Sequence, residues 1–389
     1  MTWLILFWCA VAFVAYTYAG YPFLLGLLAR LRPRPPQRNA AYAPSVAIVV
    51  VAYNEAARIA AKIDSCLAQS YRAGPVRVVI ASDGSGEEMH AVVKAYADRG
   101  VTLLPFAQRR GKAACLNDAV AACDEEVIVF TDARQRLDPD AVAKLVAVLG
   151  DPQVGAVSGE LVFEKDDASA FGDGVDAYWR YEKFIRRSEA IVGSVVGVTG
   201  ALYALKRRCF RPIPPQTILD DVAIPMQVAM QRLRVGFEPG AIAYDRPAQE
   251  VAQERVRKVR TLAGNYQLVQ LYPALLSPWH NPLFLGFVSH KLCRLLAPLA
   301  LLICLLASAA LASQSPFFLA CLVVQLLGYA LAWAGGLAGV GERFKLARIA
   351  HAFVVLNWFA VLGFKEFLVN REAHLWRANV ISAPPGPGR

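Results

Sequence analysis

Apolar and polar positions divide the chain into two kinds of segment. Residues 1–29 carry no charged side chain, and further apolar runs occupy residues 295–312, 317–340 and 346–364. At about 1.5 Å per helical residue, runs of this length are close to what crosses roughly 30 Å of hydrocarbon. Residues 43–276 instead alternate short apolar runs with stretches of helical spacing. The pattern therefore predicts membrane helices on both sides of one water-soluble domain.

Strand and helix signals alternate through the middle of the chain. The expected strands are residues 45–52, 76–81, 101–104 and 126–131, and the expected helices are residues 55–69, 87–98, 112–122 and the segment that Asp138 would cap. The run SVAIVVVA at residues 45–52 shows no polar alternation, as a strand covered on both faces requires. Repeated strand–helix alternation predicts an α/β fold with a mostly parallel central sheet, flanked by transmembrane helices.

The charges beside the first apolar run indicate its orientation. Arg30, Arg32, Arg34 and Arg38 follow the run directly. Because positive charge is retained in the cytoplasm, we expect residues 1–29 to form an N-terminal transmembrane anchor and residues 43–276 to form a cytosolic domain. A cleaved signal peptide is the alternative, although its positive charge would precede the apolar core.

The second apolar region is expected to contain several elements. Residues 282–296 mix apolar side chains with His290, Lys291 and Arg294, which predicts an interfacial amphipathic helix. We assign residues 297–369 to C-terminal transmembrane helices and residues 370–389 to a tail. Four crossings would leave the cationic tail outside, against the charge rule, so the number of crossings and the side of the C-terminus stay open.

Composition agrees with this two-part organisation. Hydrophobic residues make up 56% of the chain and charged residues 19%, which excludes both an ordinary soluble globule and a disordered chain. The formal net charge is +10. Its cationic residues gather beside the apolar runs, so we expect membrane lipids and not nucleic acid as a partner. The eight cysteines include no CxxC pair, which indicates reduced thiols.

Polar side chains follow three of the expected strands. Tyr53 and Glu55 come after the first strand, Asp83 after the second and Asp132 after the fourth. The carboxyl ends of parallel strands share one edge, where ligands bind in open α/β sheets. Each residue alone could be a helix cap or a turn former. Three such strand ends on one edge predict a site for a ligand with sugar or phosphate groups.

Five short motifs then occur in a fixed order. They are AYNE at Ala52–Glu55, SDGS at Ser82–Ser85, Gly111-Lys112 with Leu116-Asn117, TDA at Thr131–Ala133, and LDD at Leu219–Asp221. Together with the apolar flanks, this order resembles the membrane-embedded family 2 glycosyltransferases, the relatives of cellulose, chitin and hyaluronan synthases. The resemblance extends from the strand at Ser45 to about Gly264. It implies a GT-A nucleotide-diphospho-sugar transferase fold, a divalent metal (Mg²⁺ or Mn²⁺) and inversion at the anomeric carbon.

The resemblance implies nucleotide-binding roles for residues at the strand ends. Tyr53, Glu55 and Lys112 correspond to family positions around the nucleotide, and Asp83 corresponds to the carboxylate that accepts a hydrogen bond from uracil. A UDP-linked donor is favoured on this ground alone, and GDP stays open. Asp132 corresponds to the first acid of the DxD metal motif. Arg134 stands in place of the second acid, so Asp132 is the expected metal ligand, and Arg134 could instead meet the diphosphate.

The LDD motif implies the catalytic base. Asp221 corresponds to the carboxylate that deprotonates the acceptor hydroxyl, and Asp220 stands where relatives often have Glu. Paired carboxylates at a helix start are also common caps, which is the structural alternative. Gly200, within the sequence Thr-Gly-Ala at 199–201, corresponds to the loop on the acceptor side.

A further motif departs from the processive relatives, which carry QxxRW. Arg260 matches the arginine, a position that could hold the diphosphate, but Arg257 replaces Gln and Thr261 replaces Trp. Threonine cannot stack on an acceptor sugar as an aromatic ring would. The structural alternative for these basic residues is a helix that faces lipid head groups.

The sequence as a whole predicts a membrane-bound inverting glycosyltransferase. It would move a sugar from a cytosolic nucleotide-sugar to a glycan or lipid-linked acceptor, in a bacterial inner (plasma) membrane, with or without a partner protein. A processive polysaccharide synthase is one alternative, against which the altered QxxRW motif argues. A non-catalytic nucleotide-binding relative is the other, and the missing second DxD acid is its main support.

Overall fold

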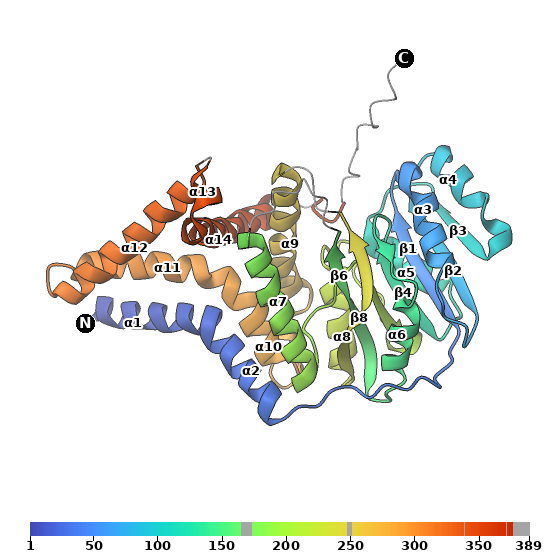
Figure 1. Cartoon of the computed structure of the whole chain (residues 1–389), viewed down its shortest axis with the longest axis horizontal. Coiled ribbons are helices and arrows are strands. Elements are labelled where there is room, and N and C mark those ends of the chain that lie inside the picture. Colours follow the sequence, from blue (N-terminus) through green and yellow to red (C-terminus); the bar gives the residue numbers. More distant parts are fainter. Residues whose placement is uncertain (165–172, 247–250, 338, 371, 376–389) are drawn as a thin grey trace, which may run out of the picture.

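The structure, a computed structural model, describes residues 1–164, 173–246, 251–337, 339–370 and 372–375. An α/β domain lies on one side of the molecule, and the apolar helices from both ends of the sequence lie together on the other (Figure 1). Most of the tail expected at residues 370–389 lies outside the described residues.

A mixed sheet of eight strands forms the centre of the α/β domain, within the residues described. Its strand order is β3-β2-β1-β4-β7-β6-β8-β5. The strands are β1 (Val46–Ala52), β2 (Val76–Asp83), β3 (Val101–Phe106), β4 (Val127–Asp132), β5 (Arg136–Leu137), β6 (Val154–Phe163), β7 (Tyr203–Lys206) and β8 (Arg234–Asp245). The first four pair in parallel, as predicted. β7 is antiparallel to both β4 and β6, in a part of the chain where the sequence predicted no strand.

Burial on both faces explains the unbroken apolar run of β1. Val46, Ile48 and Val50 pack in one cluster with α3 (Ala56–Leu67), α4 (Glu87–Lys94) and α6 (Ala141–Leu149). The alternate residues Ala47 and Val49 pack in the other cluster with α5 (Lys112–Ala121) and α8 (Asp220–Met230). Successive side chains of a strand point to opposite faces, so helices on both faces leave no polar position.

The helix predicted to begin after Asp138 begins later. α6 starts at Ala141 and its N-cap residue is Asp140. Asp138 instead accepts the Asp140 N–H at 3.2 Å and pairs with Lys144 at 3.4 Å. The prediction that Asp138 caps this helix was wrong, because its side chain closes the turn that precedes the helix.

Four helices of the described part are long and apolar enough to cross a membrane: Thr2–Leu31, Phe284–Leu311, Pro316–Gly335 and Lys345–Val369. The first joins α1 (Thr2–Ala15), the π-helical turn η1 (Tyr16–Gly20) and α2 (Tyr21–Leu31), and the second joins α10 (Phe284–Phe287), the π-helical turn η5 (Val288–Leu292) and α11 (Cys293–Leu311). The others are α12 (Pro316–Gly335) and α14 (Lys345–Val369), with the short α13 (Val340–Arg343) between them. The segment expected to be a separate interfacial helix at residues 282–296 is thus continuous with α11.

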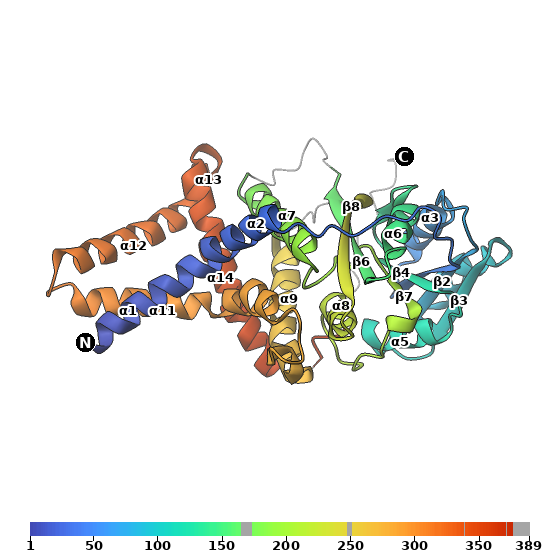
Figure 2. The ribbon, with the colours of Figure 1, turned by 90° about the horizontal axis from the view of Figure 1, so that it is seen from below.

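Two helices connect the sheet to the apolar helices. α7 (Asp173–Val192) packs on α2, and α9 (Val251–Leu271) packs along α14. Figure 2 shows α1 beside α11, with α7 and α9 between these helices and the sheet. Short 3₁₀ turns at η2 (Ala97–Arg99), η3 (Arg207–Cys209) and η4 (Pro273–Leu276) complete the described elements. At the contact between α9 and α14, the rings of Tyr266 and Phe364 lie 5.1 Å apart.

The contact between α9 and α14 depends on Gly363. A Cβ at this position would lie 2.7 Å from the Cβ of Leu262 on α9. We expect Gly363→Ala to destabilise the protein by about 1–3 kcal/mol, because overpacking forces the two helices apart. Thermal unfolding in detergent micelles measures the effect.

Gly328 on α12 provides the matched control, since nothing lies within 4 Å of a Cβ added there. Gly328→Ala should unfold at the wild-type temperature or slightly above it, because alanine is the better helix former. Equal unfolding temperatures for the two variants would contradict the close approach of α14 to α9.

Candidate active site

A cavity of about 1,670 Å³ lies between the carboxyl edge of the sheet and helices α9 and α14. Nine of the ten site residues predicted from the sequence line it: Tyr53, Glu55, Lys112, Asp132, Gly200, Asp220, Asp221, Arg257 and Arg260. The tenth is Asp83. The strand-end residues and the residues from α8 and α9 therefore share one space.

Three carboxylates and one ammonium group meet in this cavity. Lys112 Nζ lies 2.9 Å from Asp132 Oδ1 and 3.0 Å from Asp220 Oδ2. A Cβ built on Gly200 would lie 3.7 Å from Asp221 Oδ2, 3.7 Å from Lys112 Nζ and 3.8 Å from Asp132 Oδ2. These groups thus surround Gly200, and a larger residue there would occupy the space between them.

Asp83 lies elsewhere than expected. It is fully buried and does not line the cavity. Its carboxylate accepts the backbone N–H of Arg110 at 2.6 Å and of Gly111 at 3.0 Å, and the Cys115 thiol lies 3.3 Å away. The expectation that Asp83 shares the cavity with Asp132 and Asp221 therefore needs correction: its oxygens already hold the loop that leads to Lys112.

Glycine is required at the turn before Lys112. Gly111 has φ +92°, a left-handed conformation that other residues adopt at a cost. This turn starts α5 at Lys112, in the position from which its side chain reaches Asp132. Gly84 also has positive φ, and a Cβ there would lie 2.7 Å from the backbone nitrogen of Arg109. The two glycines allow the loop at 108–111 to pack against the end of β2.

An aromatic ring and a guanidinium group, from Tyr53 and Arg109, stack at the cavity wall next to the end of β1. The guanidinium carbon of Arg109 lies 4.1 Å from the centroid of the Tyr53 ring. Tyr53 was predicted from the sequence as a site residue, but Arg109 was not, because nothing distinguished it from the adjacent basic residue Arg110. Glu55 lines the same region, where burial raises the pKa of its carboxyl although Arg58, 3.4 Å away, opposes the shift.

The acids of the cavity differ in pKa. Burial raises the pKa of Asp221 to about 6, and the neighbouring Asp220 carboxylate adds to the shift. For Asp132, burial would raise the pKa, but the Lys112 ammonium and Arg134 hold it below its usual value. Asp132 is therefore ionised at neutral pH, whereas Asp221 titrates near the pH range in which a general base is most effective.

Cationic side chains line the cavity on two sides, from α9 and from the turn after β4. Arg257 and Arg260 of α9 line the cavity, and Arg260 Nε donates to the Ala373 carbonyl at 2.8 Å. Arg134 also lines the cavity, and its guanidinium pairs with the buried Asp245 at 2.9 Å. The cavity thus contains positive charge as well as the acids, which suits a ligand with a diphosphate group.

The far end of the cavity reaches the apolar helices. Phe353 and Leu356 of α14 line this end, together with Tyr18 and Arg294. The Tyr18 hydroxyl donates to Asn357 Oδ1 at 3.0 Å. Sequence reasoning did not assign these residues to the site. The available signal was a polar residue inside an apolar run, which often marks a functional position.

The donor set of the cavity bears on metal binding. Among the residues described, no group of three or more His, Cys, Asp or Glu side chains is placed to hold a metal ion. Asp132 offers one carboxylate, of which Oδ1 pairs with Lys112 and Oδ2 faces Gly200. One hard oxygen ligand fits Mg²⁺ or Mn²⁺ if phosphate and water oxygens fill the remaining coordination positions.

Comparison with solved structures identifies the fold. The mannosyltransferase PcManGT from Pyrobaculum calidifontis, solved in complex with GDP-Man and Mn²⁺, superposes with a TM-score of 0.71 over 94% of this chain and 99% of its own. The two sequences are 23% identical, so the likeness shows the fold alone. The chain therefore has the GT-A glycosyltransferase fold with added apolar helices, as predicted.

Comparison with protein families and curated proteins identifies the family. The family described as glycosyl transferase family 2 matches residues 47–211. An N-acetylglucosaminyltransferase of Azorhizobium caulinodans is 28% identical over 216 residues, and the match spans 51% of this chain and 54% of that protein. An N-acetylglucosaminyltransferase of Rhizobium leguminosarum bv. trifolii is 33% identical over 124 residues, which are 31% of this chain and 68% of that protein.

The region that matches the family contains Tyr53, Lys112 and Asp132, which the structure brings together in one cavity. Sequence likeness, fold and cavity agree, and the chain belongs to glycosyltransferase family 2.

Proposed function

We propose that this protein is a membrane-bound inverting glycosyltransferase that moves a sugar from a nucleoside-diphosphate sugar to a lipid-linked or glycan acceptor. The observation that carries the proposal is the convergence of Lys112, Asp132 and Asp221 around Gly200, in a cavity that continues to α14. Because the match spans only about half of the Azorhizobium relative, donor and acceptor are part of the proposal.

The nucleotide would bind at the β1 end of the cavity. The Arg109–Tyr53 pair offers a flat, polarisable surface for a base. Lys112, which pairs with Asp132 and Asp220, and Arg260, which lines the same cavity, would neutralise the diphosphate as negative charge grows on it. UDP-N-acetylglucosamine is the first donor to test because of the names of the matched relatives, and GDP-mannose is the second because of the superposed structure.

Asp132 would hold the divalent ion from the protein side. When bound, such an ion supplies Lewis-acid stabilisation of the diphosphate leaving group. The Lys112 ammonium at 2.9 Å keeps Asp132 ionised and supplies a second positive charge close to the same oxygens. The absent second DxD acid therefore does not remove the positive environment that the leaving group needs.

Asp221 would act as the general base. Single displacement with inversion needs a base that takes the proton of the acceptor hydroxyl on the side opposite the leaving group. With a pKa raised to about 6, Asp221 binds a proton more strongly than an exposed carboxylate, yet it is mostly ionised at neutral pH. This retained acid argues against a non-catalytic role for the protein.

The acceptor would enter from the membrane side. The cavity end lined by Phe353 and Leu356 is apolar and belongs to a helix that could cross the membrane. An acceptor with a lipid tail and a polar head group suits a cavity that is apolar at one end and charged at the other. Thr261 in place of an aromatic ring disfavours processive synthesis, which stays the second candidate.

The proposed location is the bacterial inner membrane with the α/β domain in the cytoplasm. Bacterial relatives and four candidate spans support membrane association in a bacterium. The arginines at 30, 32, 34 and 38 support a cytoplasmic position for the segment after the first span.

A donor panel tests the proposed function directly. Native membranes that contain the protein are incubated with radiolabelled UDP-N-acetylglucosamine, UDP-glucose and GDP-mannose, and the products are extracted and sized. We expect one donor to label a lipid-extractable product of discrete size. Label in none of the products would count against the activity, and a long polymer would favour the processive alternative.

The ionisation of Asp221 predicts the pH dependence of transfer. A base with a pKa near 6 must lose its proton to act, so kcat/KM should fall as the pH falls through about 6. Above about pH 6, where Asp221 is ionised, Asp221→Asn should lower transfer by about 10²–10⁴-fold and leave UDP affinity nearly intact. Initial rates across pH 5–8, roughly the range where the group titrates, provide the measurement.

Asp220→Asn is the control for this assignment. Without the Asp220 charge the pKa of Asp221 should be lower, so the acid limb of the rate profile should move to lower pH. An acid limb that stays in place in Asp220→Asn, or normal activity in Asp221→Asn, would remove Asp221 from the role of base.

Asp132→Ala tests the metal site. We expect the variant to lose the Mn²⁺-dependent part of UDP binding, because Asp132 is the one protein carboxylate proposed to hold the ion. Thermal stabilisation by UDP with and without Mn²⁺ measures this loss. The same UDP response in wild type and variant would show that another group holds the ion.

A further inference from the structure

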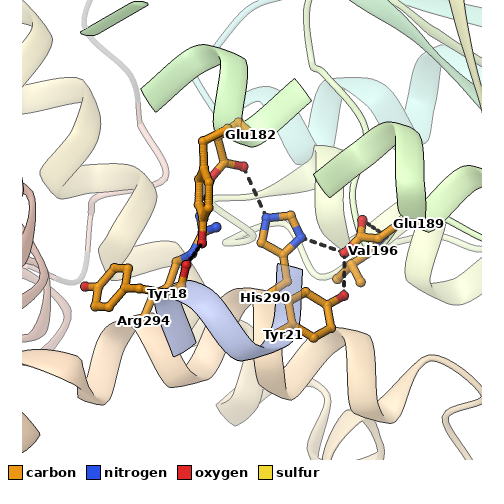
Figure 3. A network of polar contacts seen from close by, with 8 residues as sticks. Tyr18, Tyr21, Glu182, Glu189, Val196, His290 and Arg294 are labelled. Carbon is orange, nitrogen blue, oxygen red and sulfur yellow. Dashed lines mark hydrogen bonds and ion pairs between the residues drawn. The ribbon is translucent and has the colours of Figure 1, made fainter. Parts of the chain in front are cut away.

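A polar cluster is buried where the first apolar helix, α7 and η5 meet. We call Tyr21, Glu182, Glu189, His290 and Arg294 the junction cluster. Figure 3 shows His290 between the two glutamates, at 2.7 Å from Glu189 Oε1 and 3.1 Å from Glu182 Oε2. The Tyr21 hydroxyl donates to Glu189 Oε1 at 3.0 Å, and Arg294 bonds to the second oxygen of Glu182. The cluster joins three elements that are far apart in the sequence.

His290 lies between two buried carboxylates. Each of its ring nitrogens faces a carboxylate oxygen, and an ionised carboxylate can only accept. Burial alone would raise the pKa values of Glu182 and Glu189, but Arg294 and His290 hold the first below its usual value and His290 does so for the second. The cluster thus favours the ionised form of both glutamates.

One member of the cluster also contacts the active-site loop. Glu189 Oε2 accepts the backbone N–H of Val196 at 3.3 Å. Two residues later, the Val198 N–H donates to the Asp221 carbonyl at 2.9 Å, and Gly200 follows among the catalytic groups. The segment 195–201 is therefore held at its start by Glu189 and farther along by the backbone of Asp221.

The turn that carries His290 also packs on this loop. A Cβ built on Gly197 would lie 3.8 Å from Lys291 Nζ and 3.6 Å from the Asp221 carbonyl oxygen. His290 and Lys291 belong to η5, a π-helical turn in a helix that could cross the membrane. Such turns shift side chains out of α-helical spacing and often occur at functional sites.

We propose that Glu189 is a positioning residue for the acceptor side of the active site, held by His290 and Tyr21 and fixing the loop that ends at Gly200. The apolar helices would thereby set the position of this loop. The inference depends on the proposed function only for the name "acceptor side"; the link from Glu189 to the loop is independent of the sugar transferred.

Glu182 supplies a matched comparison within the cluster. Both glutamates bond to His290 and are ionised, but only Glu189 also accepts the Val196 N–H. A glutamine at either position has one accepting oxygen in place of two. In Glu189→Gln that single oxygen can accept hydrogen bonds either from His290 and Tyr21 or from the Val196 N–H, but not from both sides. In Glu182→Gln the conflict lies between His290 and Arg294, away from the loop.

Hydrogen exchange of the full-length protein in detergent micelles distinguishes the two variants. In Glu189→Gln we expect amide exchange across residues 195–200 to be about tenfold faster than in wild type, the scale of one lost hydrogen bond. In Glu182→Gln exchange of this segment should stay at the wild-type rate, although both variants unfold at lower temperature. Equal acceleration in both variants, or none in Glu189→Gln, would overturn the proposal.

Tyr21→Phe is the milder variant in case Glu189→Gln does not fold. It removes one hydroxyl that bonds to Glu189 and leaves the charges in place. Exchange of residues 195–200 should rise about two- to threefold, with Tyr16→Phe, which removes a bond to Ser289, as the control without effect on the loop. Equal exchange in Tyr21→Phe and Tyr16→Phe would contradict the proposal.

Two further measurements separate this inference from the proposed function. UDP affinity should be unchanged in Glu189→Gln, since the nucleotide end of the cavity is not altered. Transfer of label from a saturating donor sugar should fall about tenfold while the KM for the donor stays the same. If no donor is accepted by wild type, the exchange result alone still decides the role of Glu189.

Discussion

The ion pairs of Lys112 are the interactions on which the active site depends. Three carboxylates in one partly buried cavity repel one another unless a positive charge lies between them. Lys112 contacts Asp132 and Asp220, at 2.9 and 3.0 Å, whereas burial and the Asp220 carboxylate raise the pKa of Asp221 against the opposing charge of Lys112. The lysine therefore keeps Asp132 ionised, while burial and the neighbouring Asp220 leave Asp221 with a pKa of about 6.

The fold positions this lysine through backbone geometry. Asp83 at the end of β2 accepts the N–H groups before α5, and the left-handed Gly111 starts the helix at Lys112. Asp83 is therefore part of the support of the site in this structure. The buried Lys62 also supports the site. Its ammonium donates to the hydroxyl of Thr131, the residue before Asp132, and to the Gln135 carbonyl. Packing and hydrogen bonds behind the cavity thus determine which way its charged side chains point.

The apolar helices, which are long enough to cross a membrane, also line part of the candidate active site. α14 lines the far end of the cavity, and the close approach at Gly363 attaches it to α9, which carries Arg257 and Arg260. The junction cluster attaches α2 and η5 to the loop of Gly200. A catalytic domain separated from these helices would lose one wall of its cavity and the support of one loop, so the two parts work as one unit.

The sequence alone determined the parallel half of the sheet, because a strand buried on both faces needs an unbroken apolar run and repeated strand–helix alternation produces parallel pairing. Nine of the ten site residues that it predicted line the cavity, because parallel strands end at one edge and the family resemblance supplied the residues of α8 and α9. Only the tertiary structure decided the positions of β6 to β8, the inward direction of Asp83 and the cluster that joins Tyr21, Glu189 and His290. Their contacts connect residues 101 and 168 positions apart, and local periodicity carries no information about such pairs.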